Sequence, residues 1–469
     1  MRRIIKPSFS FTDLEMQRQG VRLDPTLQAI SDFLDQHGSL VEMVYQDLVR
    51  GLKNPATGRD GIDPERVLRS FLLKGIKNWD LRELRERLAD SYTLRQFTTF
   101  YDDWIPSFQT FHSTFSRLRP ETMLALNEAA VQAAVEMRLE DGNKLRVDTT
   151  VSETNIHRPS DSAQLWDTVR VVTRLVRQLG EHLPDLTSGF PNRCRRAKRR
   201  MLEISRMDRQ QRQARQQRKY RDLLEVLERA GQVAEQACRQ LPTDPLAAAT
   251  VTAVVQRIEH YRGLGQQVME QTRRRVLQGE TVPAGEKILS IFQPHTDVIK
   301  RGKAEKPVEF GHKIFLAESA IGLITEYRVL DGNPSDEQQV EPSLEHHQQM
   351  FGKSPELYAG DRGFYSAANQ QRWEAAQIKT VSVPYRGGHK TPERRALEKS
   401  PAFRKGQRFR AGIEGRISVL FRARGMKRCL LDGRPRFELF VGAAVLVNNL
   451  IVIARQLLQR QARRRRLAA

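Results

Sequence analysis

The spacing of apolar residues changes abruptly at Lys144, and this change constrains the fold more than any other feature. Before it, residues up to about 135 show the three- and four-residue spacing of helices. From Lys144 onward a period of two predicts a β-strand: Leu145, Val147, Thr149 and Val151 alternate with Arg146, Asp148 and Thr150. Helical spacing returns from about 161 to 285, and strand-like runs resume near Pro307. This order predicts an α/β core, a mixed sheet flanked by helices, with a helical insertion after its first strand.

The sequence predicts four regions. Residues 1–135 form an N-terminal helical domain, which we interpret as DNA-binding. Residues 136–160 and 286–455 form a discontinuous core, residues 161–285 a basic helical insertion, and residues 456–469 a basic C-terminal tail. Asp63 and Pro64 are predicted to open one N-terminal helix, and Leu81, Leu84 and Leu88 mark another. The aromatic series Trp104, Phe108, Phe111 and Phe115 has helical spacing, which favours core packing over stacking on nucleobases.

The second half predicts alternating strands and helices. Residues 308–317 and 323–330 are expected to form an antiparallel hairpin, and Ser335 with Gln338 resembles a capping box that opens a helix to about Met350. Short strands are expected at 356–359 and 380–384, with a helix starting at Ser366 between them. Residues 386–410 are interpreted as a basic loop, and a helix is expected from Ala411, so that Glu414 lies in its first turn.

The charge of the chain favours a polyanionic partner. The formal net charge is +22 and the isoelectric point is about 10.2. Twelve Lys or Arg residues lie between Arg193 and Lys219 against two acids, and nine lie between Arg386 and Arg410 against two acids. Nucleic acid is the leading partner and an anionic membrane the rival, but no uncharged apolar run reaches about 18 residues. The best candidate, 441–454, contains Asn448 and Asn449. Three scattered cysteines and the lack of a secretion signal predict a reduced, cytoplasmic protein without membrane partners.

Three acids stand at positions where the predicted core would carry chemistry. Asp148 lies on the alternating strand, Asp361 follows a strand between Gly360 and Gly363, and Glu414 follows the basic segment. Three carboxylates supply the hard oxygen ligands that a pair of Mg²⁺ ions needs. Each acid also has a structural interpretation: Asp148 as a solvent-facing edge residue, Asp361 as a turn former, and Glu414 as a charge favoured near a helix start.

With these residues the chain resembles the DDE-type transposases of bacterial insertion sequences. The segments that carry the resemblance are Val147-Asp148-Thr149-Thr150 with residues 153–162, Lys306 to Lys313, Ala359-Gly360-Asp361-Arg362-Gly363-Phe364-Tyr365-Ser366, Ala411 to Arg416, and Asn448-Asn449-Leu450. The similarity covers nearly the whole chain. It implies an RNase H-like core in which Asp148, Asp361 and Glu414 are the catalytic residues and hold two Mg²⁺ or Mn²⁺ ions. It also implies DNA nicking and strand transfer at terminal inverted repeats, a homodimer on double-stranded DNA, and a cytoplasmic, nucleoid-associated location.

Relatives carry a Tyr, Arg, Glu, Lys signature around the last acid. Arg410 holds the Arg place, whereas Gln407 and Phe421 stand in the Tyr and Lys places, with Arg422 and Arg424 close by. We therefore expect Arg410, Arg422 and Arg424 to bind DNA phosphates. The same role is expected for basic residues of two further segments: Arg195, Arg196, Lys198, Arg199, Arg200, Arg404 and Lys405.

Several alternatives stay open on the sequence. Asp161 lies in the matched segment and is an alternative to Asp148. His157, His312 and His389 lack metal-ligand spacing and are interpreted as hydrogen-bonded structural residues. A nuclease or resolvase with the same core would cleave without joining. A catalytically decayed protein that still binds DNA ends is the third possibility, because Phe421 departs from the signature.

Overall fold

The alternating segment forms β1 (Lys144–Glu153), an inner strand of a mixed sheet with the order β2-β3-β1-β5-β6, in which β4 also pairs with β3. In this computed structural model, residues 15–16, 18–57, 60–182, 184, 192–207, 212–238, 245–300 and 307–468 are described. β1 pairs with β5 in parallel, and β5 pairs with β6 in parallel, whereas β3 pairs with β4 and β2 antiparallel. The bounds are Asp297–Lys300 (β2), Val308–Ser319 (β3), Ile324–Val329 (β4), Leu357–Ala359 (β5) and Thr380–Ser382 (β6). The predicted fold class, a mixed sheet flanked by helices, is confirmed.

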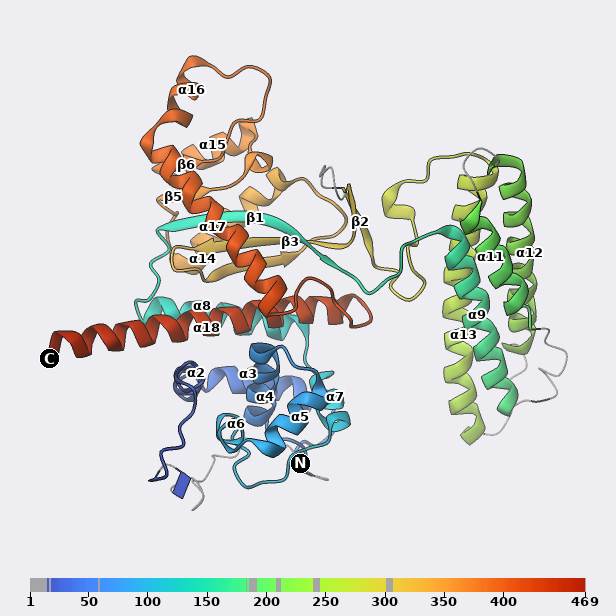
Figure 1. The fold of residues 1–469 in the computed structure, drawn as a ribbon, viewed down its shortest axis with the longest axis horizontal. Helices are drawn as coiled ribbons and strands as arrows, with labels where there is room; N and C mark the ends of the chain where they lie inside the picture. Colours follow the sequence, from blue (N-terminus) through green and yellow to red (C-terminus); the bar gives the residue numbers. More distant parts are fainter. Residues whose placement is uncertain are drawn as a thin grey trace. The chain divides into compact units, whose positions relative to one another are not determined.

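The chain divides into two compact units. Unit 1 contains Met1–Glu153 and His312–Ala469, and unit 2 contains Thr154–Gly311. Figure 1 shows the sheet of unit 1 with α17 lying against it, and the upright helices of unit 2 in green.

The N-terminal part of unit 1 is helical, as predicted. Its helices are α2 (Pro25–Gln36), α3 (Ser39–Val49), α4 (Pro64–Lys77), α5 (Leu81–Asp90), α6 (Tyr92–Phe97), α7 (Phe108–Phe115) and α8 (Pro120–Glu136). Asp63 caps α4 by accepting hydrogen bonds from the backbone N–H groups of Glu65 and Arg66. Phe111 and Phe115 are buried, but Trp104 precedes α7 and is 72% exposed. The core-packing interpretation therefore holds for these two residues and is wrong for Trp104.

Two expectations about the second half of unit 1 are wrong. Residues 386–410 are not one loop, because they contain α16 (Pro392–Lys399) and the first part of α17 (Pro401–Ala423). Lys and Arg are good helix formers, and Pro at the first position starts each helix. Ser335 makes no side-chain cap; it precedes the short 3₁₀ helix η4 (Asp336–Gln339), which leads into α14 (Val340–Phe351). A second short helix, η5 (Arg362–Phe364), precedes α15 (Ala367–Ala375).

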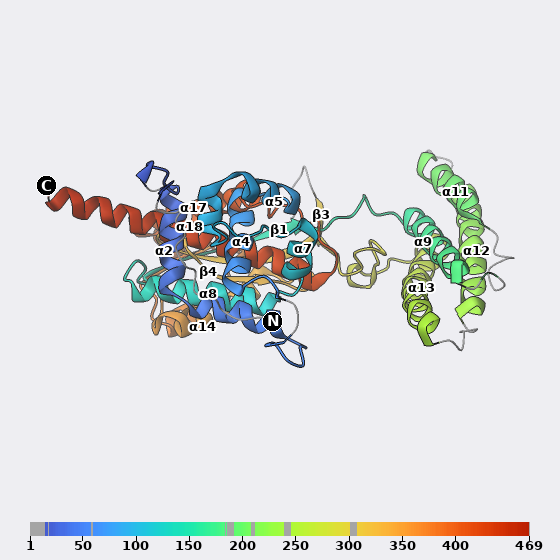
Figure 2. The same cartoon turned by 90° about the horizontal axis from the view of Figure 1, so that it is seen from below.

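The last helix, α18 (Arg434–Ala468), is continuous through the segment expected to be a separate tail. It runs beside α8, as the two views of Figures 1 and 2 agree. This helix is long and apolar enough to cross a membrane by length and composition alone, whereas the apolar run expected from the sequence is too short. However, 83% of its most apolar stretch of 18 residues is buried inside the protein. Asn449 lies in this buried part and binds both the N–H and the C=O of Ile324, so the Asn pair has a structural role.

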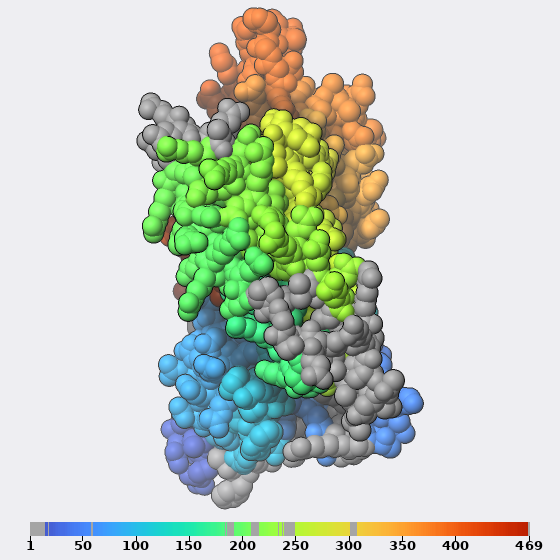
Figure 3. Space-filling model, turned by 90° about the vertical axis from the view of Figure 1, so that its right-hand side faces the viewer, coloured from blue at the N-terminus to red at the C-terminus, as the bar shows by residue number. Residues whose placement is uncertain are grey.

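Unit 2 consists mainly of helices with a core of their own, as the predicted insertion requires. They are α9 (Asp161–His182), α11 (Cys194–Arg206), α12 (Arg212–Cys238) and α13 (Pro245–Thr272), followed by the π-helix η2 (Arg273–Leu277) and η3 (Ala284–Glu286). Leu165, Val169, Val172, Val176 and Leu179 of α9 are fully buried, in agreement with the helical spacing expected from about 161 to 285. Figure 3 shows the surface of these helices in green. Arg209 and Asp208 of the basic segment lie outside the described residues.

Candidate active site

Parallel pairing of β1 with β5 brings two of the predicted acids to the same end of the sheet. The register pairs Arg146 with Ala359. Asp148 and Asp361 each lie two residues beyond that pair (148 − 146 and 361 − 359), so Asp148, in the middle of β1, lies beside Asp361, which follows the end of β5. Ligand sites of open α/β sheets form at the carboxyl ends of the strands. Asp361 therefore lies where a ligand site is expected, with Asp148 beside it on the neighbouring strand β1.

Asp148 is a buried residue on an inner strand. It is 7% exposed, and β1 lies between β3 and β5, so its interpretation as a solvent-facing edge residue is wrong. The backbone N–H of Thr149 donates to Asp148 Oδ1 over 2.8 Å. A buried carboxylate costs free energy unless cations or hydrogen-bond donors satisfy it. A positively charged partner would therefore stabilise the ionised form of Asp148.

Glu414 reaches this end of the sheet from α17, which packs against β1, β5 and β6. It lies in the middle of a helix of 23 residues and not in the first turn, so the expectation about its position is wrong. Arg410, one turn earlier, donates from Nη1 to Glu414 Oε1 (2.9 Å) and from Nη2 to Asp148 Oδ2 (3.3 Å). One guanidinium therefore joins the first and third acids.

The Asp361 carboxyl belongs to the same electrostatic group. Its Oδ1 accepts a hydrogen bond of 2.7 Å from the backbone N–H of Gly363, which caps η5. Burial raises its pKa above the usual value, and the nearby charge of Asp336 raises it further. The Gly363 N–H and the charges of Arg410 and Lys313 act in the opposite direction. Arg410 thus interacts with all three predicted acids.

Asp336 is a fourth acid at this place, and the sequence analysis missed it. Thr149, the residue after Asp148, donates from Oγ1 to Asp336 Oδ1 over 2.9 Å, and Lys313 Nζ lies 2.7 Å from the same oxygen. The one sequence signal is an acid that follows the hairpin and a Gly-Asn-Pro-Ser turn, Gly332 to Ser335. From the sequence, that segment predicts only the start of a helix.

The donor set fits divalent cations by its chemistry, because carboxylate oxygens are the ligands that Mg²⁺ and Mn²⁺ prefer. Among the described residues, however, no three His, Cys, Asp or Glu side chains stand as a ready-made metal-ligand set. Asp148 and Glu414 instead converge on Arg410. Asp148, Asp361 and Glu414 are the residues that would hold the cations. Arg410 would have to leave its ion pairs with Asp148 and Glu414 before a cation could bind there.

The signature positions near Glu414 have mainly structural contacts. Gln407 donates from Nε2 to the carbonyl oxygen of Ser382 (2.6 Å), and Phe421 packs on the apolar core. Arg424 donates to the carbonyl oxygen of Ile76 (2.8 Å), and burial lowers its pKa. Arg422, Arg404 and Lys405 are exposed. Gln407 and Phe421 therefore hold α17 in the fold.

The predicted phosphate-binding residues of α11 lie on two different faces. Arg196 and Arg200 form ion pairs with Asp222 of α12, and Arg200 also pairs with Glu203 over 2.8 Å. Arg195, Lys198 and Arg199 are exposed and line, with Leu202, Glu203 and Arg206, an open hollow of about 320 Å³. The first face stabilises unit 2, and the second presents positive charge to solvent.

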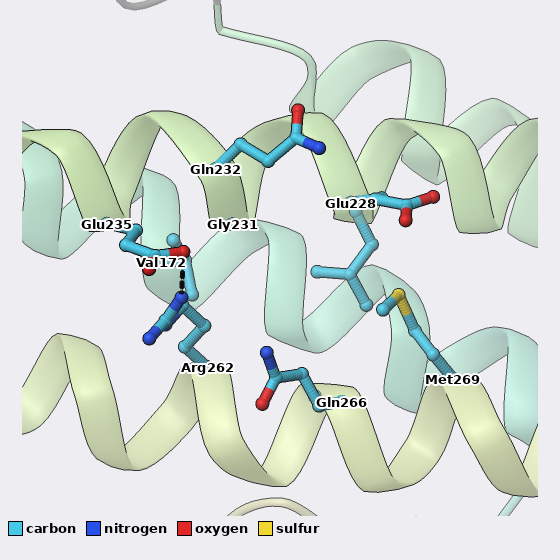
Figure 4. A pocket seen from close by; sticks show the side chains of 10 residues that line it. Val172, Glu228, Gly231, Gln232, Glu235, Arg262, Gln266 and Met269 are labelled. Carbon is cyan, nitrogen blue, oxygen red and sulfur yellow. Dashed lines mark hydrogen bonds and ion pairs between the residues drawn. The ribbon is translucent and has the colours of Figure 1, made fainter.

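The remaining polar candidates of unit 2 are bonded within that unit. Asp161, the alternative to Asp148, accepts hydrogen bonds from Gln271 (2.7 Å) and Arg275 (2.8 Å). His157 lies 2.9 Å from Asp167. A separate pocket of about 220 Å³ is lined by residues of α9, α12 and α13, with the Arg262–Glu235 ion pair (2.6 Å) on one side (Figure 4). It contains none of the predicted site residues. In unit 1, His312 is hydrogen-bonded to Arg434 over 2.9 Å.

Comparison with known proteins identifies the N-terminal helices. Residues 21–120 match the family model described as Transposase domain (DUF772). No curated protein and no solved structure matches the chain. The matched residues span α2 to α7, the helices that the sequence analysis had interpreted as DNA-binding. The match supports a transposase family for this chain.

Proposed function

We propose that this chain is a DDE transposase with an RNase H-like core, which nicks DNA at insertion-sequence ends and joins the ends to target DNA. The observation that supports it best is the convergence of Asp148, Glu414 and the Asp361 carboxyl on the charge of Arg410, beside the carboxyl end of β5. The transposase-domain match at residues 21–120 supports the same conclusion from a separate part of the chain.

The reaction is an in-line displacement at phosphorus. In the first step a water oxygen bonds to phosphorus while the bond to the 3′ oxygen breaks, and the water proton passes to that oxygen to leave a 3′-hydroxyl. In the second step the oxygen of this hydroxyl bonds to a phosphorus of the target while the bond from that phosphorus to the target's own 3′ oxygen breaks, and the hydroxyl proton passes to the released 3′ oxygen. Two bound Mg²⁺ or Mn²⁺ ions would supply Lewis acidity to the attacking and leaving oxygens.

The residues of the chain orient these participants. Asp148 lies on β1 and Asp361 directly follows the adjacent strand β5, so they would form the rigid part of the centre, since the sheet fixes their backbones. Glu414 has a side chain that is 63% exposed, so it faces the side from which DNA would approach. Arg410 would bind a phosphate once it leaves the two carboxylates, because a guanidinium matches phosphate oxygens in geometry and charge.

Double-stranded DNA is the proposed partner. The exposed cations of α11, together with Arg404, Lys405 and Arg422 of α17, would hold its phosphates, and the N-terminal helices would read the terminal repeats. Joining requires two DNA ends in one complex, so we propose a homodimer on DNA. The cytoplasm, at the nucleoid, is the location that this activity implies.

The test is Asp361→Asn in a donor-plasmid assay with Mg²⁺. Asparagine keeps the oxygen that accepts from Gly363 and removes the charge. We expect nicking and excision to fall at least a hundredfold. The matched control is Asp331→Asn, because Asp331 is a 97% exposed acid of the same unit. Excision at the wild-type rate by a folded Asp361→Asn protein would refute the proposal.

A nuclease or resolvase is distinguished by a second substrate. Incubation of the protein with a pre-cut end and a target plasmid gives a joined product only if the chain is a transposase. The decayed-protein alternative is favoured by one observation: Phe421, which stands in the Lys place of the signature, packs partly buried against the apolar core and offers no charge to a phosphate. That alternative predicts binding of DNA ends with no Mg²⁺-dependent nicking.

A further inference from the structure

We propose that the exposed end of α18 is a rigid helical arm that binds duplex DNA through the phosphates on both sides of a groove. The inference rests on DNA as the proposed partner, and it adds a surface to which none of the cations assigned above belongs. The arm is the part of α18 from residue 455 onward. It carries six arginines: Arg455, Arg460, Arg463, Arg464, Arg465 and Arg466.

The first argument is the unbalanced charge of the arm. Glu438 is the last acid in the sequence, so the arm itself contains no carboxylate. All six arginines are exposed, and none of them is ion-paired within the part of the chain that the structure describes. Arg460 donates only to the carbonyl oxygen of Met137 (2.9 Å). Uncompensated like charges repel one another, so a polyanionic partner would stabilise this surface.

The second argument is the distribution of the arginines around the helix. Successive residues of an α-helix are rotated by about 100° about its axis. The positions from Arg460 to Arg466 therefore point to all sides of the arm, and no side lacks a cation. A duplex has a row of phosphates on each side of a groove, and its major groove is wide enough for an α-helix. Cations on every side of a helix match that geometry.

The same distribution argues against an anionic membrane as the partner. A helix that lies on a membrane needs an apolar face opposite its basic face. Within residues 459–466 the only apolar side chain is that of Ala462. Leu457 and Leu458 precede this segment and pack against the hydrophobic core of unit 1. The exposed Leu467 is a single apolar side chain beyond it. The arm thus lacks the face that would enter a lipid surface.

The third argument is that the arm is fixed to the core. α18 is one continuous helix, and its apolar part is buried beside α8. Figure 2 shows its end extending beyond the other elements of unit 1. At a rise of about 1.5 Å per residue, the arginines cover roughly 16 Å along the axis, or about five base-pair steps of a duplex. A preformed arm loses less conformational entropy on binding than a disordered tail would.

A purely structural role for these arginines would be to stabilise the end of α18, because cations are favourable in the last turn of a helix. The test variant replaces residues 463–466 by Gln, which removes four charges and keeps a good helix former. The matched control replaces the same four residues by Lys, which keeps both the charge and the helix propensity. A third variant, Ala462→Pro, keeps every charge and breaks the helix between the core and these four arginines.

The experiment is fluorescence anisotropy of a labelled DNA duplex with the purified full chain, at several salt concentrations. EDTA is present, so that binding does not depend on cations at the candidate active site. We expect the Gln variant to bind at least tenfold more weakly than wild type. Its slope of log affinity against log salt concentration should decrease in magnitude by about 2–4, since each phosphate contact contributes about 0.9. The Lys variant should stay within about fivefold of wild type. Ala462→Pro should weaken binding severalfold, because the arm must then be ordered on the DNA.

The outcomes separate this inference from the proposed function. Wild-type DNA affinity and salt dependence in the Gln variant would overturn the inference and leave the proposed function intact. Such a result together with a lower melting temperature would show that the arginines only stabilise α18. Unchanged binding by Ala462→Pro would refute the rigid arm in favour of a flexible tail. Flotation with vesicles of phosphatidylglycerol and phosphatidylcholine tests the membrane: a loss of vesicle binding in the Gln variant, with DNA binding unchanged, would also overturn the inference. Failure of the wild-type chain to bind any duplex would instead refute the proposed function.

Discussion

Replacement of Arg410 by Gln is expected to tighten divalent cation binding while it weakens DNA binding. The guanidinium lies 2.9 Å from Glu414 and 3.3 Å from Asp148, between two of the proposed ligands. It therefore competes with a cation for the same carboxylates. The same group is proposed to bind a DNA phosphate once the cation has displaced it. Removal of its charge should act in opposite directions on the two partners.

The structure bounds the magnitude of this effect. Two unit charges about 4 Å apart interact by about 4 kcal/mol at an effective dielectric constant of about 20, and by about 1 kcal/mol in water. The Asp148 side chain is 11% exposed and approaches the first limit, whereas the Glu414 side chain is 63% exposed and approaches the second. Solvation of the released carboxylates offsets much of this. We expect a net gain of about 1.5–2.5 kcal/mol, which is roughly a tenfold to sixtyfold tighter Mn²⁺ affinity.

The assay is Mn²⁺ titration together with the salt dependence of binding to a DNA duplex. Arg408→Gln is the matched control, because Arg408 is exposed on the same helix two residues away and carries the same charge. The Arg410 variant should bind Mn²⁺ more tightly than the Arg408 variant. The slope of its log affinity for DNA against log salt concentration should decrease in magnitude by about 1, the contribution of one phosphate contact. Equal or weaker Mn²⁺ binding by Arg410→Gln would refute the competition argument.

Three further predictions concern stability and DNA contacts. A Cβ on Gly412 would overlap Nη1 of Arg146, the residue whose Nε donates to the fully buried Glu318, whereas Gly415 has open space around it. Urea unfolding should show a loss of about 2–4 kcal/mol in the free energy of unfolding for Gly412→Ala and a gain of up to about 1 kcal/mol for Gly415→Ala. On α11, the double variant Arg195→Ala/Arg199→Ala should lower the affinity for a DNA duplex and the salt dependence of that affinity, measured by fluorescence anisotropy. The double variant Arg196→Ala/Arg200→Ala should mainly lower the melting temperature, because these arginines pair with Asp222. Equal salt dependence in both variants would contradict the division of α11 into two faces. Because the pKa of Asp361 is raised in the folded state, its contribution to stability is favourable when it is protonated and is lost as pH rises through the folded-state pKa. Asp361→Asn should therefore melt at a higher temperature than wild type at pH 7, and the difference in melting temperature should shrink toward pH 4. A difference that stays constant with pH would show that burial of the charge is not the cause.

Much of the core could be predicted because the relevant information is local. The alternation around Asp148 identifies β1, and Gly360 with Gly363 marks the turn that carries Asp361. The hairpin of β3 and β4 and the capping of α4 and α15 also follow from short-range patterns. The buried position of Asp148 required one further fact, that β1 is an inner strand, and strand order is not a local property.

The sequence could not show what depends on long-range packing. The basic segment 386–410 has both helix-forming residues and loop-like charge, and it becomes helical where α17 packs on the sheet. Asp336 joins the other acids through Thr149, 187 residues away in the chain, so no spacing rule would find it. Likewise, Arg196 and Arg199 lie in the same basic segment, but Arg196 pairs with Asp222 and Arg199 is exposed to solvent.

The position of Glu414 depends on how closely α17 approaches the sheet, and small residues make that approach possible. A Cβ on Gly406 would overlap the side chain of Ser382 on β6, whose Oγ donates to the carbonyl oxygen of Phe403 over 2.8 Å. Further along the helix, Arg416 lies 2.9 Å from the buried Glu318 of β3, and Arg146 of β1 lies 2.8 Å from the same carboxylate. A buried ion group is costly to break because one charge would stay unpaired.

The same contacts that stabilise unit 1 thus hold the third acid near the first two. Asp148 and Asp361 are fixed by strands, but Glu414 is carried by a helix, whose rotation or shift would move the carboxylate by several ångströms. Gly406 at one end and the Glu318 ion group at the other restrict that movement. Loss of either anchor should therefore weaken cation binding without a change to any carboxylate. Mn²⁺ affinity in Gly412→Ala, measured in conditions where the variant is folded, would show whether the fold and the proposed chemistry are coupled in this way.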